Sequence, residues 1–233
     1  MGQAKPELAT GSLIASSLQD VLRPPFVSLL ILNLLLTLAS SSLTGEIDGT
    51  GFVLWVILSA LSVFVDIATV LVAGAAEPVR SADPWIKASF RIRCFWRFLG
   101  VEILTFVLVA LGLFLLVIGG FAVGAYLALG APAVVLERKK PLRALSHSAE
   151  MSEGRRLQLG VIFGVLIIVP NAGLQVAYAL NESINTVVWM AANAAGVVLM
   201  TAGTIAITRA FVRLGGATSP PAGEIRVQRA ARP

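Results

Sequence analysis

Six apolar stretches alternate with short polar segments along the chain. They lie at about 26–43, 51–76, 98–118, 121–136, 157–180 and 186–211. About 20 helical residues cross the hydrocarbon layer of a bilayer, so long apolar stretches with few charges are typical of membrane-spanning helices. The pattern predicts an all-α fold, a polytopic membrane bundle of six transmembrane helices.

Segments beside the spans alternate apolar and polar residues at helical spacing, which predicts amphipathic interfacial helices. The first covers residues 12–22. The second lies within 137–156, where Leu142, Leu145 and Ala149 share one face and Arg143, His147 and Glu150 share another. The connector 80–97 mixes arginines with aromatic residues, which favours a helix at headgroup level. Gly119 and Gly120 predict a tight turn between the third and fourth spans.

Three parts of the chain follow from this pattern. Residues 1–25 form a cytoplasmic N-terminus with an interfacial helix that ends at Pro24 and Pro25. Residues 26–213 form the membrane domain, and 214–233 form a basic cytoplasmic tail that we expect to be disordered. Glu7 and Asp20 precede the first apolar run, so we expect a retained span rather than a cleaved signal.

The composition is typical of a protein whose surface is partly in contact with lipid. Hydrophobic residues are 57% of the 233 and charged residues only 13%, against about 25% in soluble domains. The formal net charge is +5. Because the basic residues flank apolar spans, we expect them to meet anionic phospholipid headgroups rather than nucleic acid.

Charge placement predicts the orientation. All 18 lysines and arginines lie in the N-terminal segment, in 80–97, in 137–156 or at the C-terminal end. The loops after spans one, three and five carry only Glu46, Asp48 and Glu182 as charged residues. With six spans, the positive-inside rule puts both termini in the cytoplasm.

Two sets of residues are candidates for contacts. The candidate lipid- or partner-facing basic residues are Arg91, Arg93, Arg97, Arg138, Lys139, Lys140 and Arg143. Small residues at helix-packing spacing let backbones approach, or form a self-association face. The glycines at such spacing are Gly120, Gly124, Gly160, Gly164 and Gly196.

Polar residues within the spans form a candidate intramembrane site. Its members are Asp66, Glu102, Ser62, Thr69, Asn171 and Gln175. Such stripes form hydrogen bonds between helices, or line a polar cavity or substrate path. An ionised carboxylate in a span needs a partner, so we expect Asp66 to pair with Arg93 or Arg97 or to stay protonated.

Motifs of catalysis are missing from the sequence. His147 is the single histidine and Cys94 the single cysteine, and no set of residues has metal-ligand spacing. No glycine-rich phosphate loop and no G-x-S-x-G motif occurs. We therefore expect no enzyme, no metal and no cofactor.

Four short motifs in the central stretch carry a family resemblance. They are Gly119-Gly120, Ala131-Pro132-Ala133-Val134-Val135-Leu136-Glu137, Ala144-Leu145-Ser146-His147-Ser148 and Glu153-Gly154-Arg155. This region resembles the bacterial glycerophosphoryl diester phosphodiesterase membrane-domain group and related uncharacterised multi-span inner-membrane families. The resemblance implies a six-helix membrane module. It does not imply the catalytic activity, because the soluble barrel that carries it is not in this sequence.

These observations favour a non-catalytic integral protein of the bacterial inner membrane. It would act as a scaffold, anchor or modulator whose basic cytoplasmic face engages anionic lipid or a partner in a membrane protein complex. The alternative is a small transporter or channel component with a polar cavity around Asp66.

Overall fold

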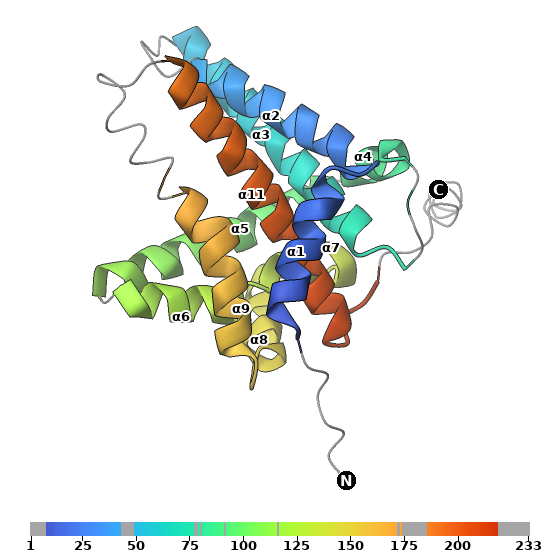
Figure 1. The fold of residues 1–233 in the computed structure, drawn as a ribbon, viewed down its shortest axis with the longest axis vertical. Coiled ribbons are helices and arrows are strands. Elements are labelled where there is room, and N and C mark those ends of the chain that lie inside the picture. Colours follow the sequence, from blue (N-terminus) through green and yellow to red (C-terminus); the bar gives the residue numbers. More distant parts are fainter. Residues whose placement is uncertain are drawn as a thin grey trace.

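Helices account for the regular structure of the described residues in the computed structural model (Figure 1). These residues are 8–42, 49–76, 79, 81–90, 92–115, 117–171, 173 and 186–218. The helices are α1 (Thr10–Val21), α2 (Phe26–Ser42), α3 (Gly49–Ala73), α4 (Asp83–Ser89), α5 (Ile92–Leu115), α6 (Val117–Leu127), α7 (Gly130–Glu137), α8 (Pro141–Met151), α9 (Arg156–Phe163), the π-helix η1 (Gly164–Ile168) and α11 (Thr186–Arg213). The all-α prediction is confirmed.

Three helices among the described residues are long and apolar enough to cross a membrane. The candidate spans are Thr50–Ala73 in α3, Arg93–Gly112 in α5 and Val187–Arg213 in α11. Helices α1 and α2 form a pair bent by 77° that adds a fourth if it counts as one span. The fourth and fifth predicted spans correspond to the shorter apolar helices Ala122–Glu137 and Arg156–Asn171, so the count of six stays a prediction.

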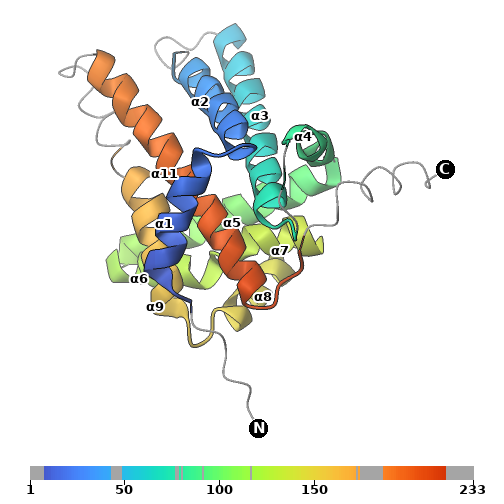
Figure 2. The same cartoon turned by 45° about the vertical axis from the view of Figure 1, so that its right-hand side comes forward.

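The long helices run in two directions. Helices α2, α3 and α11 follow the long axis of the molecule, and the α5–α6 hairpin runs across them (Figures 1 and 2). One buried cluster, which includes Leu129 and Phe211, joins α1, α3, α5 to α9, η1 and α11. A second, which includes Leu29 and Ile205, joins α1, α2, α3, α4 and α11.

Helix α1 packs on α11 and α9. Leu13, Ser17 and Val21 on one side of α1 are fully buried. Leu22, directly after the helix, is 71% exposed. The apolar side of α1 is therefore a face that packs against other helices of the protein.

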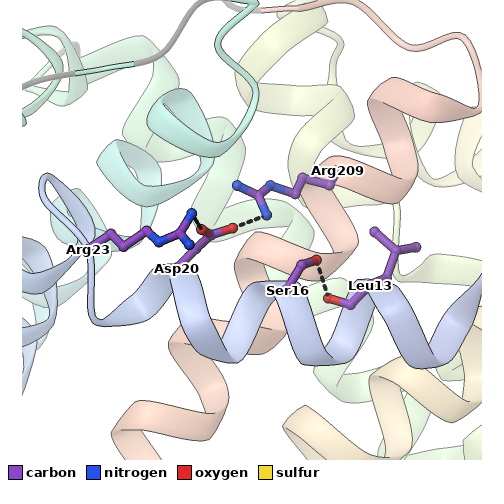
Figure 3. A network of polar contacts seen from close by, with 5 residues as sticks. All are labelled: Leu13, Ser16, Asp20, Arg23 and Arg209. Carbon is purple, nitrogen blue, oxygen red and sulfur yellow. Dashed lines mark hydrogen bonds and ion pairs between the residues drawn. The ribbon is translucent and has the colours of Figure 1, made fainter.

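An ion pair fixes α1 to α11 at the edge of this contact (Figure 3). One carboxylate oxygen of Asp20 in α1 forms an ion pair with Arg23, and the other forms an ion pair with Arg209 of α11. Asp20 and Arg209 keep only 13% and 29% of their side-chain exposure, whereas Arg23 keeps 69%. Arg209 is a cation within an apolar helix, so its carboxylate partner is what makes that position tolerable.

Two predicted boundaries are wrong. Helix α5 ends at Leu115 and α6 begins at Val117, so Gly119 and Gly120 lie in the first turn of α6 and not in a turn between helices. In the connector, α4 is a short helix over Asp83–Ser89, and Arg93 and Arg97 lie in the first two turns of α5. An aromatic and basic composition does not mark where one helix ends and the next begins.

Glycines lie where helices approach closely. Gly124 of α6 faces the ring of Phe163 so closely that a Cβ would overlap it, and Gly160 faces Ala125 across the same α6–α9 contact. Gly164 and Gly196 are buried. Arg156 stacks over the Tyr126 ring, 4.1 Å from its centroid, and adds a cation–π contact between α9 and α6.

The two arginines that contact Asp20 should contribute differently to the free energy of unfolding. Asp20→Ala should lower the free energy of unfolding by about 2 kcal/mol, because it leaves Arg209 half-buried without its counter-ion. Arg23→Ala should change it by less than about 0.5 kcal/mol, because Arg23 is largely exposed. Thermal unfolding of the purified protein in mild detergent measures both. Equal losses in the two variants would contradict the assignment.

Candidate functional site

A break in an apolar helix organises the cytoplasmic side of the predicted topology. Helix α6 ends at Leu127 and α7 begins at Gly130, which leaves backbone groups at the break without helical partners. Ser148 of α8 is fully buried against it. Its hydroxyl donates to the Tyr126 carbonyl at 2.6 Å and accepts from the Leu129 N–H at 3.1 Å. One serine thus satisfies both sides of the break.

Apolar contacts seat α8 on the same break. A Cβ at Gly130 would lie 2.9 Å from Leu145 and 3.3 Å from Val101 of α5, so only a glycine admits both neighbours as they stand. The buried face of α8 is made of Ala144, Leu145 and Ser148, and Ser152, directly after the helix, is buried as well. The predicted apolar face was wrong in one member, because Leu142 is 72% exposed.

The start of α8 lies against the start of α5. Arg97 donates to the carbonyl of Arg138 at 2.6 Å, across 41 residues of chain. A Cβ at Gly100 would lie 3.1 Å from Pro141, the first residue of α8. These two contacts bring the second and third turns of α5 against the start of α8 and the residues just before it.

We call the cations gathered here the basic surface. It consists of Arg93, Arg97, Arg138, Lys140 and Arg143. Arg97 is half-buried and the other four are exposed. Two large apolar side chains stand exposed among them, Trp96 at 62% and Leu142 at 72%. Arg91, also predicted for this face, lies outside the described residues.

Lys139 turns toward Glu137 and away from the basic surface. Its ammonium lies 2.7 Å from one Glu137 oxygen, which also accepts from His147 at 3.3 Å. The other Glu137 oxygen accepts from the N–H of Ala217, which follows α11. The carboxylate therefore ties together the end of α7, helix α8 and the chain after α11.

These contacts set the protonation of Glu137. Burial alone would raise its pKa, but the hydrogen bonds from Lys139 and Ala217 and the charges of Lys139 and His147 outweigh burial. The pKa of the carboxyl is therefore held below its ordinary value of 4.5. Glu137 is ionised at neutral pH and serves as an anchor.

Asp66 has a different partner from the one predicted. Its carboxylate accepts a hydrogen bond from the Asn33 amide of α2 at 3.4 Å. In the described part of the chain no ion pair joins it to Arg93 or Arg97, since Arg97 points to Arg138. The helix α2–α3 contact brings an amide closer to Asp66 than either arginine of α5.

The other candidate polar residues are satisfied mainly within their own helices. Ser62 bonds to the carbonyl of Leu58, Thr69 to that of Val65 and Asn171 to that of Ile167. Such bonds to the residue four back remove the need for a partner on another helix. Gln175 lies outside the described residues.

Glu102 lies on an exposed side of α5. The structure therefore joins Asn33 to Asp66, while Ser62, Thr69 and Asn171 make local contacts.

Metal binding has no support in the part of the chain that the structure describes. No group of three or more His, Cys, Asp or Glu side chains could hold an ion there. His147 instead pairs with Glu137 and meets the Phe211 ring edge-on at 6.4 Å between centroids.

Two structural residues were missed by sequence reasoning. Arg209 is a cation within the last apolar stretch and therefore needs a carboxylate partner. In the structure this partner is Asp20. Ser148 belongs to the motif Ala144-Leu145-Ser146-His147-Ser148. No sequence signal indicates that its hydroxyl would form hydrogen bonds with the backbone at a helix break about 20 residues earlier.

Comparison with protein-family models, with curated proteins and with solved structures finds no match for this chain. The resemblance to the phosphodiesterase membrane-domain group therefore stays a prediction.

The role of Ser148 predicts a loss on its removal. Ser148→Ala should lower the free energy of unfolding by about 1–3 kcal/mol, because it leaves a buried N–H and a buried carbonyl without partners. Ser146→Ala on the same helix is the matched control, since Ser146 is exposed and bonds only within α8. It should cost less than about 0.5 kcal/mol. Thermal unfolding in detergent compares them, and a Ser148→Ala protein as stable as the control would contradict this role.

The Glu137 anchor predicts a specific acid sensitivity. Because its pKa is lower in the folded state, ionised Glu137 stabilises the fold at neutral pH. This contribution disappears as the pH falls through the folded-state value, below about 4.5. Glu137→Gln should therefore lose less stability than the wild type between about pH 7 and pH 3.

The matched control for this titration is Glu150→Gln, because Glu150 is an exposed carboxylate of the same helix α8. It should keep the wild-type dependence of melting temperature on pH. The prediction fails if Glu137→Gln and wild type lose stability in parallel.

Proposed function

We propose that the chain is a non-catalytic integral membrane protein that acts as a scaffold, anchor or modulator. In this proposal it has six spans in a bacterial inner membrane, with both termini in the cytoplasm. Its basic surface engages anionic phospholipid headgroups or a partner protein. Support comes from its long apolar helices and from the lysines and arginines that gather beside them.

One observation carries the proposal most directly. The basic surface is built from two helices far apart in sequence, held by the Arg97–Arg138 hydrogen bond and the Gly100–Pro141 contact. Helix α8 is itself fixed by Ser148. Cations displayed on a fixed frame bind anions at lower entropic cost than cations on a free loop.

A specific observation favours the alternative of a small transporter or channel component. The Asn33–Asp66 hydrogen bond puts a carboxylate and an amide between two apolar helices. Thr201 on α11 is 6% exposed, and its hydroxyl has no recorded partner in the described structure. Intramembrane polar groups of this kind mark ion or substrate paths in other proteins.

Purification from native membranes in mild detergent tests the proposal. The variant Lys140→Gln/Arg143→Gln removes two exposed cations of the basic surface. Its control, Lys87→Gln/Arg213→Gln, removes two exposed cations elsewhere on the described chain. We expect the wild type and the control to retain a stoichiometric companion, a protein or anionic lipid, which the surface variant loses.

Two results would contradict this proposal. One is that wild type and surface variant carry the same companions in the same amounts. The other is solute or proton flux in reconstituted vesicles that Asp66→Asn abolishes and Lys140→Gln/Arg143→Gln leaves intact. The second result would favour the transporter.

A further inference from the structure

A stripe of residues spaced three or four apart runs along one side of α5 from the basic surface into the apolar span. Its exposed members are Arg93, Trp96, Ile103, Val107 and Leu111, and Gly100 between them is half-buried against Pro141. This spacing keeps residues on one side of a helix. Ile103, Val107 and Leu111 are 54%, 46% and 55% exposed. The stripe therefore begins with a cation and an exposed tryptophan, meets α8 at Gly100 and continues beyond it as an exposed apolar track.

Helix α8 borders this stripe at Gly100. Pro141 lies beside Gly100, and the exposed Lys140 and Arg143 are one residue before it and two residues after it. Leu142 stands between these two cations and is 72% exposed. Cations and apolar groups thus meet at one point.

Acidic groups near this point are engaged elsewhere or face away. Glu137 is held by Lys139, His147 and the Ala217 N–H. Glu102 is nine residues from Arg93, about two and a half helical turns, which puts it on the opposite side of α5. Within the part of the chain that the structure describes, no carboxylate forms an ion pair with Arg93, Lys140 or Arg143, which favours an anion from outside the chain.

An occupant must match both ends of the stripe. In the most apolar window of the α5 span only 11% of residues are buried, so most of this helix contacts its surroundings. A phosphodiester headgroup complements the cations, and an acyl chain complements Ile103, Val107 and Leu111. A soluble acidic protein would match only the charged end.

We infer that the α5–α8 junction is a binding site for an anionic phospholipid of the surrounding bilayer. Its phosphate lies at Lys140 and Arg143, level with Leu142, and its acyl chain follows Ile103, Val107 and Leu111. This inference rests on the proposed function and narrows its partner to a lipid.

The test uses full-length protein reconstituted in vesicles of equal parts phosphatidylcholine and phosphatidylglycerol. Protein is then extracted in mild detergent, and the lipids it retains are identified by native mass spectrometry. The wild type should retain phosphatidylglycerol in excess of phosphatidylcholine. Each cation near a membrane surface contributes about fivefold to affinity, so Lys140→Gln/Arg143→Gln should weaken retention by about 25-fold. Lys87→Gln/Arg213→Gln should keep the wild-type preference.

A second arm separates a lipid from a free phosphate. Excess inorganic phosphate should leave the retained phosphatidylglycerol in place, because the acyl chain supplies part of the binding. Displacement by phosphate would overturn the lipid assignment. Size-exclusion elution and helix content by circular dichroism verify that the variants are folded.

The remaining outcomes decide between the lipid site and the broader proposed function. Retention of both lipids in equal parts by the wild type, or a preference that survives Lys140→Gln/Arg143→Gln, overturns the lipid site. If that variant still loses a protein companion from native membranes, the proposed function stands and only the lipid inference fails. If no companion depends on these residues, both fail.

Discussion

Hydrocarbon offers no hydrogen bonds, and this constraint shapes the centre of the molecule. A helix that breaks near a membrane must find partners for its freed backbone groups inside the protein. At the break between α6 and α7 the partner is the Ser148 hydroxyl. Meeting this need draws α8 against the membrane domain, with Leu145 fitted over Gly130.

The position of the basic surface follows from that contact. With α8 seated, Pro141 meets Gly100 and Arg97 reaches the Arg138 carbonyl. Lysine and arginine side chains from both helices then stand at the head of an apolar helix. The functional proposal and the lipid site are both consequences of one broken helix and the serine that satisfies it.

Sequence reasoning recovered what hydrophobicity alone determines. Apolar runs placed α2, α3 and α11 within a few residues, since span length is set by the solvent. Contacts between distant segments were harder. The pattern of α1 shows an apolar side without showing that α11 covers it, and the i−4 bonds of Ser62 and Thr69 depend on rotamers. For Asp66, charge alone suggested an arginine, but helix packing supplies Asn33.

Membrane depth of the α5–α8 junction is the most direct test. In a Cys94→Ser background, spin labels at Leu142→Cys, Phe106→Cys and Glu150→Cys report their depth in vesicles by their accessibility to oxygen and to a water-soluble nickel complex. The account predicts Leu142 at the headgroups, Phe106 in hydrocarbon and Glu150 in water. A label at Leu142 in bulk water, or at Phe106 outside hydrocarbon, would contradict it.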